Sequence, residues 1–166
     1  MSIATPVPRP AQPVDLPHIL RLIRGLADYE RLLHAATVTQ DELGAALFGP
    51  LPRAHVVLAD VAGNPVGLAL FYYTFNSFKA GSNMFLEDLF VDPAHRGTGI
   101  GLALMRYLAR RAVMENCRWI EWRVLNWNQP AIDFYQRLGA RKMQDWHTRQ
   151  LGGGALAALA EGTSHG

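Results

Sequence analysis

The stretch at residues 86–105 reads LEDLFVDPAHRGTGIGLALM, and it decides the predicted fold. It begins as an apolar strand that carries two acidic residues, Glu87 and Asp88. A proline-containing turn, an arginine and three alternate glycines follow, and the apolar spacing then changes to that of a helix. Glycines let a backbone turn tightly and present several N–H groups to one ligand, and a helix N-terminus adds partial positive charge. The stretch therefore predicts a strand, a phosphate-binding loop and a helix in succession.

The spacing in this loop excludes three other phosphate-binding patterns. A Walker A loop ends in Gly-Lys-Ser/Thr, whereas Leu102 and Ala103 follow Gly101 here. A dinucleotide fingerprint needs the spacing G-x-G-x-x-G, which these glycines do not give. A protein-kinase loop belongs to a much longer chain. The pattern that remains is R-x-x-G-x-G, formed by Arg96, Gly99 and Gly101.

Length and composition predict one globular domain in solution. The 166 residues are 49% hydrophobic and 18% charged, which is ordinary for a folded domain. A net charge of +2 gives no reason to expect a nucleic-acid partner. The sequence has neither a signal peptide nor a run long enough to cross a membrane, so we expect a cytoplasmic protein with no membrane partner. The histidines lack the spacing of metal ligands, and no metal is expected.

The hydrophobic pattern along the whole chain predicts a mixed α/β fold. In the first half, the expected elements are an edge strand or extended arm at 5–13, a helix capped by Asp15 that runs to about Tyr29 or Glu30, a helix from a capping box at Thr39 and Glu42 to near Gly49, two strands within 54–75 and a strand at 83–91. In the second half, they are a helix at about 99–115, a strand at 118–125, a helix at 128–140 that ends at Gly139, and a strand at 140–151.

Four blocks in this order resemble the GCN5-related N-acetyltransferases (GNAT), and in particular their spermidine/spermine branch. The blocks are LRLIRGLADYE at 20–30, LEDLFV at 86–91, RGTGIG at 96–101 and NWNQPAIDFYQRLGA at 126–140. The resemblance implies a central, mostly antiparallel sheet with a splayed parallel strand pair that binds acetyl-CoA, and helices on both faces. The sequence shows no domain boundary, so we expect a single acetyltransferase domain at 1–151, followed by a flexible tail at 152–166 whose composition allows one short helix.

The resemblance implies which residues carry the chemistry. An amine must be neutral to attack the thioester of acetyl-CoA, and Glu87 stands at the position of the family's general base. Tyr135 is similar to the general acid that protonates the leaving thiolate. By strand alternation, Asp88 is expected on the opposite face, in a structural or cofactor-side role. Each side chain also has an alternative: Glu87 as the partner of an arginine, Tyr135 as a core residue, and Arg96 as a solvated charge.

The cofactor is expected to contact the strand, the loop and one later asparagine. A backbone N–H group of this strand, at Leu89, Phe90 or Val91, is the candidate to stabilise the oxyanion of the tetrahedral intermediate. The loop is expected to hold the pyrophosphate of acetyl-CoA. In full, the predicted cofactor-binding residues are Leu89, Phe90, Val91, Arg96, Gly97, Thr98, Gly99, Ile100, Gly101, Leu102 and Asn128. No motif activates Cys117, so direct transfer within a ternary complex is expected, without an acyl-enzyme.

The substrate is expected to be a small primary amine, bound in part by Tyr29, Glu30 and Glu87. Tyr29 and Glu30 match a substrate-binding pair of the polyamine branch, but the continuation RLLHAATVT at 31–39 lacks the further acids of the polyamine enzyme. This departure favours a diamine or a lysine-like amino acid over a long polyamine. Acetylation of a protein or peptide, or a non-catalytic acetyl-CoA-binding module, remains the alternative. Relatives in this branch dimerise, which predicts a homodimer.

Overall fold

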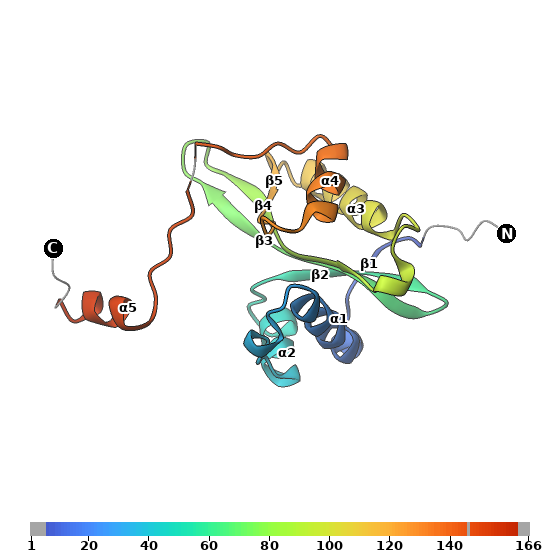
Figure 1. The fold of residues 1–166 in the computed structure, drawn as a ribbon, viewed down its shortest axis with the longest axis horizontal. Helices are drawn as coiled ribbons and strands as arrows, with labels where there is room; N and C mark the ends of the chain where they lie inside the picture. Colours follow the sequence, from blue (N-terminus) through green and yellow to red (C-terminus); the bar gives the residue numbers. More distant parts are fainter. Residues whose placement is uncertain (1–5, 146, 163–166) are drawn as a thin grey trace. The chain divides into compact units, whose positions relative to one another are not determined.

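A five-stranded sheet in the order β1-β2-β3-β4-β5 is the framework of the chain up to Arg123 (Figure 1). Its strands are β1 Arg9–Pro10, β2 His55–Val61, β3 Asn64–Asn76, β4 Gly81–Val91 and β5 Ile120–Trp122. The first four strands are joined by antiparallel pairing, whereas β4 and β5 are parallel. This mixed sheet, with one parallel pair at its end, confirms the predicted fold class.

Helices and short 3-10 turns connect these strands, and the chain divides into two units, Met1–Arg123 and Val124–Gly166. The computed structural model describes residues 6–145 and 147–162. In the first unit lie η1 Pro13–Asp15, α1 Leu16–Tyr29, η2 Leu33–Ala35, α2 Gln40–Phe48, η3 Pro93–His95 and α3 Ile100–Met114. In the second lie α4 Gln129–Arg137 and α5 Gly153–Ala160. Across the described residues, no helix is both long and apolar enough to span a bilayer.

The helices of the first unit cover both faces of its sheet, as predicted. On one face, α1 and α2 pack against alternate residues of the central strands, and this core contains Ile19, Leu22, Leu43, Leu47, Leu58, Leu68 and Phe90. On the other face lies α3, which buries Leu104 and Leu108 completely (Figure 1). At Gly67 of β3, a Cβ atom would lie 2.8 Å from Ile100, so the missing side chain lets α3 begin close to the sheet.

The helix starts show one confirmed cap and one correction. Thr39 and Glu42 form the predicted reciprocal capping box at the start of α2. Asp15 does precede α1, but its side chain makes no cap for that helix. It accepts hydrogen bonds instead from the Arg9 guanidinium at 2.8 Å and from the Gln12 N–H at 2.8 Å. The Asp15 carboxylate, predicted to cap α1, is therefore bonded to Arg9 instead.

Two predicted strands in the second half differ from expectation. The strand predicted at 118–125 is reduced to Ile120–Trp122, because its pairing with β4 ends at Leu86. The described residues of 140–151 form no strand, and Trp146 lies outside the described residues, as does the end of the tail at 163–166. Along the described part of that segment the side chains from 141 onward are exposed, including Met143 and Leu151. The large apolar residues of this segment, Met143, Trp146 and Leu151, are three and five positions apart in the sequence, so they do not alternate as one buried face of a strand would.

Candidate active site

The glycine-rich loop between β4 and α3 turns as the sequence predicts. Gly97 and Gly99 have φ values of +73° and +89°, which favour glycine, and Gly99 directly precedes α3. Gly101 lies in the first turn of α3 without a positive φ, so its contribution is the space left by the missing side chain. Within the loop, the Thr98 hydroxyl donates to the His95 carbonyl at 2.6 Å.

The start of α3 is an anion-binding end by its backbone geometry. The first N–H groups of an α-helix have no carbonyl partner within the helix, and the helix dipole makes this end positive. Here these groups belong to Ile100, Gly101 and Leu102. The Ile100 side chain is buried, so only its backbone can face a ligand. The arrangement fits a phosphate group, as the loop motif predicts.

Arg96 joins this loop to the end of α1. Its Nε atom donates to the Val91 carbonyl at 3.0 Å, and its guanidinium carbon lies 4.6 Å from the centre of the Tyr29 ring. The same group lies 5.5 Å from the Phe90 ring. Arg96 is solvent-accessible but held by these contacts, so it is more than a solvated loop charge. Through it, the predicted substrate residue Tyr29 lies beside the predicted cofactor loop.

A β-bulge in β4 places the two acidic residues. Leu70 of β3 pairs with Asp88 and the next residue, Phe71, pairs with Leu86, so Glu87 is the extra residue on β4. A bulge of this kind interrupts the regular alternation of side chains and re-aims them. Asp88 consequently lies on the face of its partner Leu70, which is the face covered by α1.

Glu87 faces the same side as Asp88, contrary to the expectation of opposite faces. Burial raises the pKa of Tyr72, and the negative charge of nearby Glu87 adds to this effect, while the Tyr72 ring stacks on Phe85 across the α1 face of the strands. Glu87 is also paired with Arg123 at 3.7 Å, so the alternative of an arginine partner is realised too. The alternation rule failed because it assumes a strand without a bulge.

Three carboxylates thus gather at the α1 face of β4, and we call Glu30, Glu87 and Asp88 the carboxylate cluster. Burial raises the pKa of Asp88 to about 6, with further contributions from the negative charges of Glu87 and Glu30. Burial also raises the pKa of Glu30. A cationic group placed here would relieve this repulsion, so the cluster is complementary to an ammonium ion.

Beyond the bulge, β4 has one open edge. The pairing with β5 ends at Leu86, whereas the pairing with β3 continues to Val91. The Asp92 N–H donates to Val66 of β3 at 2.8 Å. Because successive N–H groups of a strand point to opposite edges, the N–H groups of Leu89 and Val91 point to the open edge. Phe90, the third predicted oxyanion donor, directs its N–H to β3 instead.

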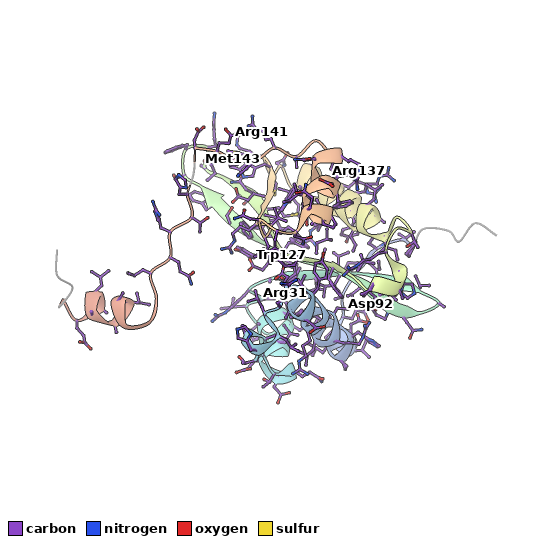
Figure 2. All side chains as sticks on the ribbon, viewed as in Figure 1. Arg31, Asp92, Trp127, Arg137, Arg141 and Met143 are labelled. Atoms are coloured by element: carbon purple, nitrogen blue, oxygen red, sulfur yellow. The ribbon has the colours of Figure 1, made fainter. Side chains whose placement is uncertain are left out.

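The middle of α1 is fixed against the end of β4. Arg21 of α1 pairs with Asp92 at 2.9 Å and donates to the Pro65 carbonyl at 2.7 Å. The helix ends at Tyr29, Glu30 follows as its C-cap, and Arg31, which is labelled in Figure 2, turns the chain away with a φ of +62°. This turn places an arginine where the polyamine branch continues with acids.

The second unit contains the other two predicted residues. Asn128 precedes α4 and its side chain accepts a hydrogen bond from the Ala131 N–H, so it caps the start of this helix. Tyr135 lies on α4 with its ring 5.3 Å from that of Phe134. Gly139, with a φ of +86°, ends the helix as expected. The proposed roles of Tyr135 and Asn128 remain predictions.

A family model described as "Acetyltransferase (GNAT) family" matches residues 23–140. This range includes the bulge, the glycine loop, α3 and α4. The chain belongs to the GNAT acetyltransferase family. It is an acetyl-CoA-dependent N-acetyltransferase, and the loop and helix start described above fit the anionic cosubstrate of this family.

Known proteins with related sequences and structures agree with this assignment. A Bos taurus protein named thialysine N-epsilon-acetyltransferase is 36% identical, over 92% of this chain and 95% of its own. A Homo sapiens protein named spermidine/spermine N(1)-acetyltransferase-like protein 1 is 34% identical, over 84% of this chain and 21% of its own. The fold also matches an integron cassette protein from V. cholerae, with a TM-score of 0.80, 24% identity and coverage of 96% and 99%.

Sequence reasoning missed three residues at this site. Asp88 was assigned to the opposite face, and Tyr72 and Arg123 were not recognised as neighbours of Glu87. In the parallel pairing of β4 with β5, Leu86 is the partner of Trp122, so the next residues of the two strands, Glu87 and Arg123, are neighbours. The expected parallel strand pair was therefore the signal that could have identified Arg123. Among the described residues, no cluster of three or more His, Cys, Asp or Glu is suited to a metal ion. The absence of a metal in the reaction stays a prediction.

Proposed function

We propose that this N-acetyltransferase acts on the primary amine of a small molecule, either a diamine or a lysine-like amino acid. The observation that carries the proposal is the carboxylate cluster beside the glycine loop, joined to it by the contacts of Arg96 with Val91 and Tyr29. The cluster is suited to attract a cationic amine, and acetyl-CoA supplies the acetyl group when it is bound at the loop.

Glu87 is the proposed general base. An alkyl ammonium has a pKa of about 10.4, so only about one molecule in a thousand is neutral at pH 7. Glu87 is 41% exposed in its side chain, which lets it receive the proton directly or through a water molecule. Asp88 and Glu30 are the proposed partners that hold the ammonium while Glu87 acts.

The open edge of β4 is the proposed oxyanion site. The N–H groups of Leu89 and Val91 point there, and fixed donors aimed at a developing negative charge are effective in catalysis. The pyrophosphate of acetyl-CoA is assigned to the backbone from Gly97 to Leu102. Asn128 is proposed to line the arm of the cosubstrate, and Tyr135 to protonate the thiolate that leaves.

Transfer is proposed to be direct, within a ternary complex. The alternative is an acyl-enzyme on Cys117, which needs a thiolate. Burial raises the pKa of this thiol, and the nearby charge of Glu115 adds to the effect. Cys117 is therefore a poor nucleophile at neutral pH.

A lysine-like amino acid is the favoured substrate class within the proposal. Arg31 stands where the polyamine branch carries acids, and this reduces the attraction for a long polycation. Thialysine, which the name of the Bos taurus relative gives as its substrate, is an amino acid with a side-chain amine. Diamines remain the second substrate class to be tested.

A screen of acetyl-CoA-dependent thiol release tests this proposal. Wild-type enzyme is assayed with lysine, thialysine, ornithine, putrescine, cadaverine, spermidine and short peptides that begin with alanine or contain lysine. We expect turnover with small amino acids or diamines and little with peptides. Turnover with peptides alone would establish the protein-acetylating alternative, and acetyl-CoA binding without any turnover would indicate a binding module.

We also propose that the enzyme is a homodimer. α5 has no buried residue within this chain, and its Leu156 and Leu159 are each 52% exposed. A helix of eight residues is marginal in water without tertiary packing, so a second copy is the proposed partner. Light scattering at micromolar concentration should give the dimer mass, and replacement of both leucines by glutamate should shift it to the monomer. A monomeric wild-type protein would refute the proposal.

A further inference from the structure

The guanidinium of Arg123 lies beside the proposed base but is not fully engaged by it. Its Nη2 atom is 3.7 Å from Glu87 Oε2, which is longer than a hydrogen bond. Its guanidinium carbon lies 5.4 Å from the Phe85 ring centre, and the side chain is 64% exposed. Of the hydrogen bonds made by the described residues, none is donated by this guanidinium.

Other arginines in the chain pair with carboxylates much more tightly. Arg21 donates to both oxygens of Asp92, at 2.9 and 3.1 Å. Arg9 holds Asp15 with two nitrogens, at 2.8 and 3.0 Å. These pairs satisfy a carboxylate within the fold, whereas the exposed side chain of Arg123 makes only the 3.7 Å contact with Glu87. A planar guanidinium with unused donors is suited to bind an incoming carboxylate in a bidentate way.

The charges around Arg123 form two regions of opposite sign. The carboxylate cluster is negative and complementary to an ammonium group, whereas Arg123 adds one positive group at the end of β5. A diamine offers a second cation at its far end, which has no favourable partner at Arg123. An α-amino acid with a side-chain amine offers a carboxylate there instead. The site is therefore complementary to both ends of such a molecule.

We propose that Arg123 binds the α-carboxylate of an amino acid whose side-chain amine is directed to Glu87, and that it makes the enzyme prefer amino acids over diamines. The proposal rests on the proposed function, because it assumes that a small amine occupies this site. The exposed side chain of Arg123 leaves the loose contact with Glu87 and pairs with the substrate carboxylate. Arg123 acts in specificity and takes no part in proton transfer.

The test compares substrates that differ only in the carboxylate. Lysine, lysinamide and cadaverine share one side-chain amine and chain length, but only lysine carries the negative charge. Values of kcat/KM are measured at saturating acetyl-CoA for wild type, Arg123→Gln and Arg123→Lys. The control is Arg106→Gln, which removes an exposed arginine from α3 on the other face of the sheet. Thermal unfolding of each variant shows that the fold is retained.

We expect wild type to prefer lysine over cadaverine. Arg123→Gln should lower kcat/KM for lysine by roughly 5- to 10-fold, the range for one solvent-accessible charge-assisted contact. Cadaverine and lysinamide should be unaffected, and Arg123→Lys should retain part of the preference. An equal loss for all three substrates, or an unchanged ratio of lysine to cadaverine, would overturn the assignment. If wild type prefers cadaverine, only the role of Arg123 fails; if no amine is acetylated, the proposed function fails with it.

Discussion

Two groups of charged side chains lie on opposite faces of the sheet, and they are bonded in different ways. On the α3 face, Arg111 Nε donates to the Tyr73 hydroxyl at 3.1 Å and to the Glu115 carboxylate at 2.9 Å. The Tyr73 hydroxyl in turn donates to Glu115. We call these three residues the closed network, because each member is satisfied by the other two.

In the carboxylate cluster on the α1 face, by contrast, the charges are not balanced by partners of opposite charge. Its negative charges oppose one another, and the pKa of Asp88 rises to about 6 as a result of burial and this repulsion. The nearby Arg123 makes only a 3.7 Å contact with Glu87. The difference separates a structural polar group from a functional one: a fold tolerates unbalanced buried charge where a ligand is to supply the missing partner. We test this difference with five predictions, and the first four are in order of decreasing effect.

The largest loss of activity is expected when the proposed general acid, which protonates the leaving thiolate, is removed. Tyr135→Phe should lower kcat by roughly 10²- to 10⁴-fold, the usual loss for a general acid, while acetyl-CoA affinity stays nearly unchanged. Tyr73→Phe is the matched control from the closed network and should keep wild-type kcat. The measurement is steady-state kinetics where chemistry limits turnover. A wild-type kcat for Tyr135→Phe would reduce Tyr135 to a packing residue.

The next effect concerns the glycine loop. Gly101→Val places a branched side chain beside the first N–H groups of α3, and it should lower CoA affinity by roughly 10- to 100-fold, as expected for the loss of charge-assisted hydrogen bonds. Gly101→Ala is the smaller change and should lose less. Titration calorimetry gives the affinities, and circular dichroism shows that the fold is retained. Undiminished binding by the valine variant would refute the assignment of the pyrophosphate to this loop.

The carboxylate cluster and the closed network should have opposite effects on stability. Because the folded pKa of Asp88 is raised, the folded state holds this proton more tightly than the unfolded chain does. Its contribution to stability therefore falls as the pH rises from about 4 through 6. Asp88→Asn should raise the free energy of unfolding at pH 8 by roughly 1–3 kcal/mol, with a smaller gain at pH 4.

Glu115 supplies the opposite case. Burial acts to raise its pKa, but hydrogen bonds with Tyr73 and Arg111 outweigh this and lower it. Its stabilisation is present above its ordinary pKa and is lost as the pH falls through the lowered value. Glu115→Gln should lower the free energy of unfolding at pH 8 by about 0.5–1 kcal/mol, since the group is partly exposed and screened. Denaturant titrations at pH 4 and pH 8 that gave both variants the same sign would remove the distinction between the two groups.

The smallest effect on turnover is expected for a substitution of Cys117, which lies beside the closed network. Cys117→Ala should keep near-normal turnover, because the thiol is not an acyl carrier in the proposed direct transfer. Initial-rate plots should intersect, as they do when both substrates bind before any product leaves. Parallel plots together with an acetyl group trapped on Cys117 would overturn direct transfer.

Local patterns predicted much of the fold, because their signals lie within a few residues. The capping box of Thr39 and Glu42 marked the start of α2, and Gly139 marked the end of α4. Gly97 and Gly99 have the left-handed backbone that a tight loop requires. The resemblance to the GNAT family followed from four short sequence blocks and their order along the chain.

The details of the site depended on pairing between distant residues, which periodicity does not encode. Nothing in the run around Glu87 shows that an extra residue is accommodated there, yet this bulge brings Glu87 and Asp88 to one face. The same alternation rule overestimated β5, whose ladder with β4 ends at Leu86. Asp15 was assigned as a cap because no local pattern shows that Arg9 would take its carboxylate.

The proposed role of Glu87, removal of the proton from the amine, predicts a characteristic pH dependence for Glu87→Gln. Values of kcat/KM are measured from pH 7 to pH 10 for wild type, Glu87→Gln and the control Glu115→Gln. We expect a loss in kcat/KM of roughly 10²-fold or more for Glu87→Gln at pH 7. This loss should shrink steadily toward the amine pKa of about 10.4, where the base is no longer needed. Glu115→Gln should follow the wild-type profile throughout. A profile of Glu87→Gln that runs parallel to wild type at every pH would contradict the claim.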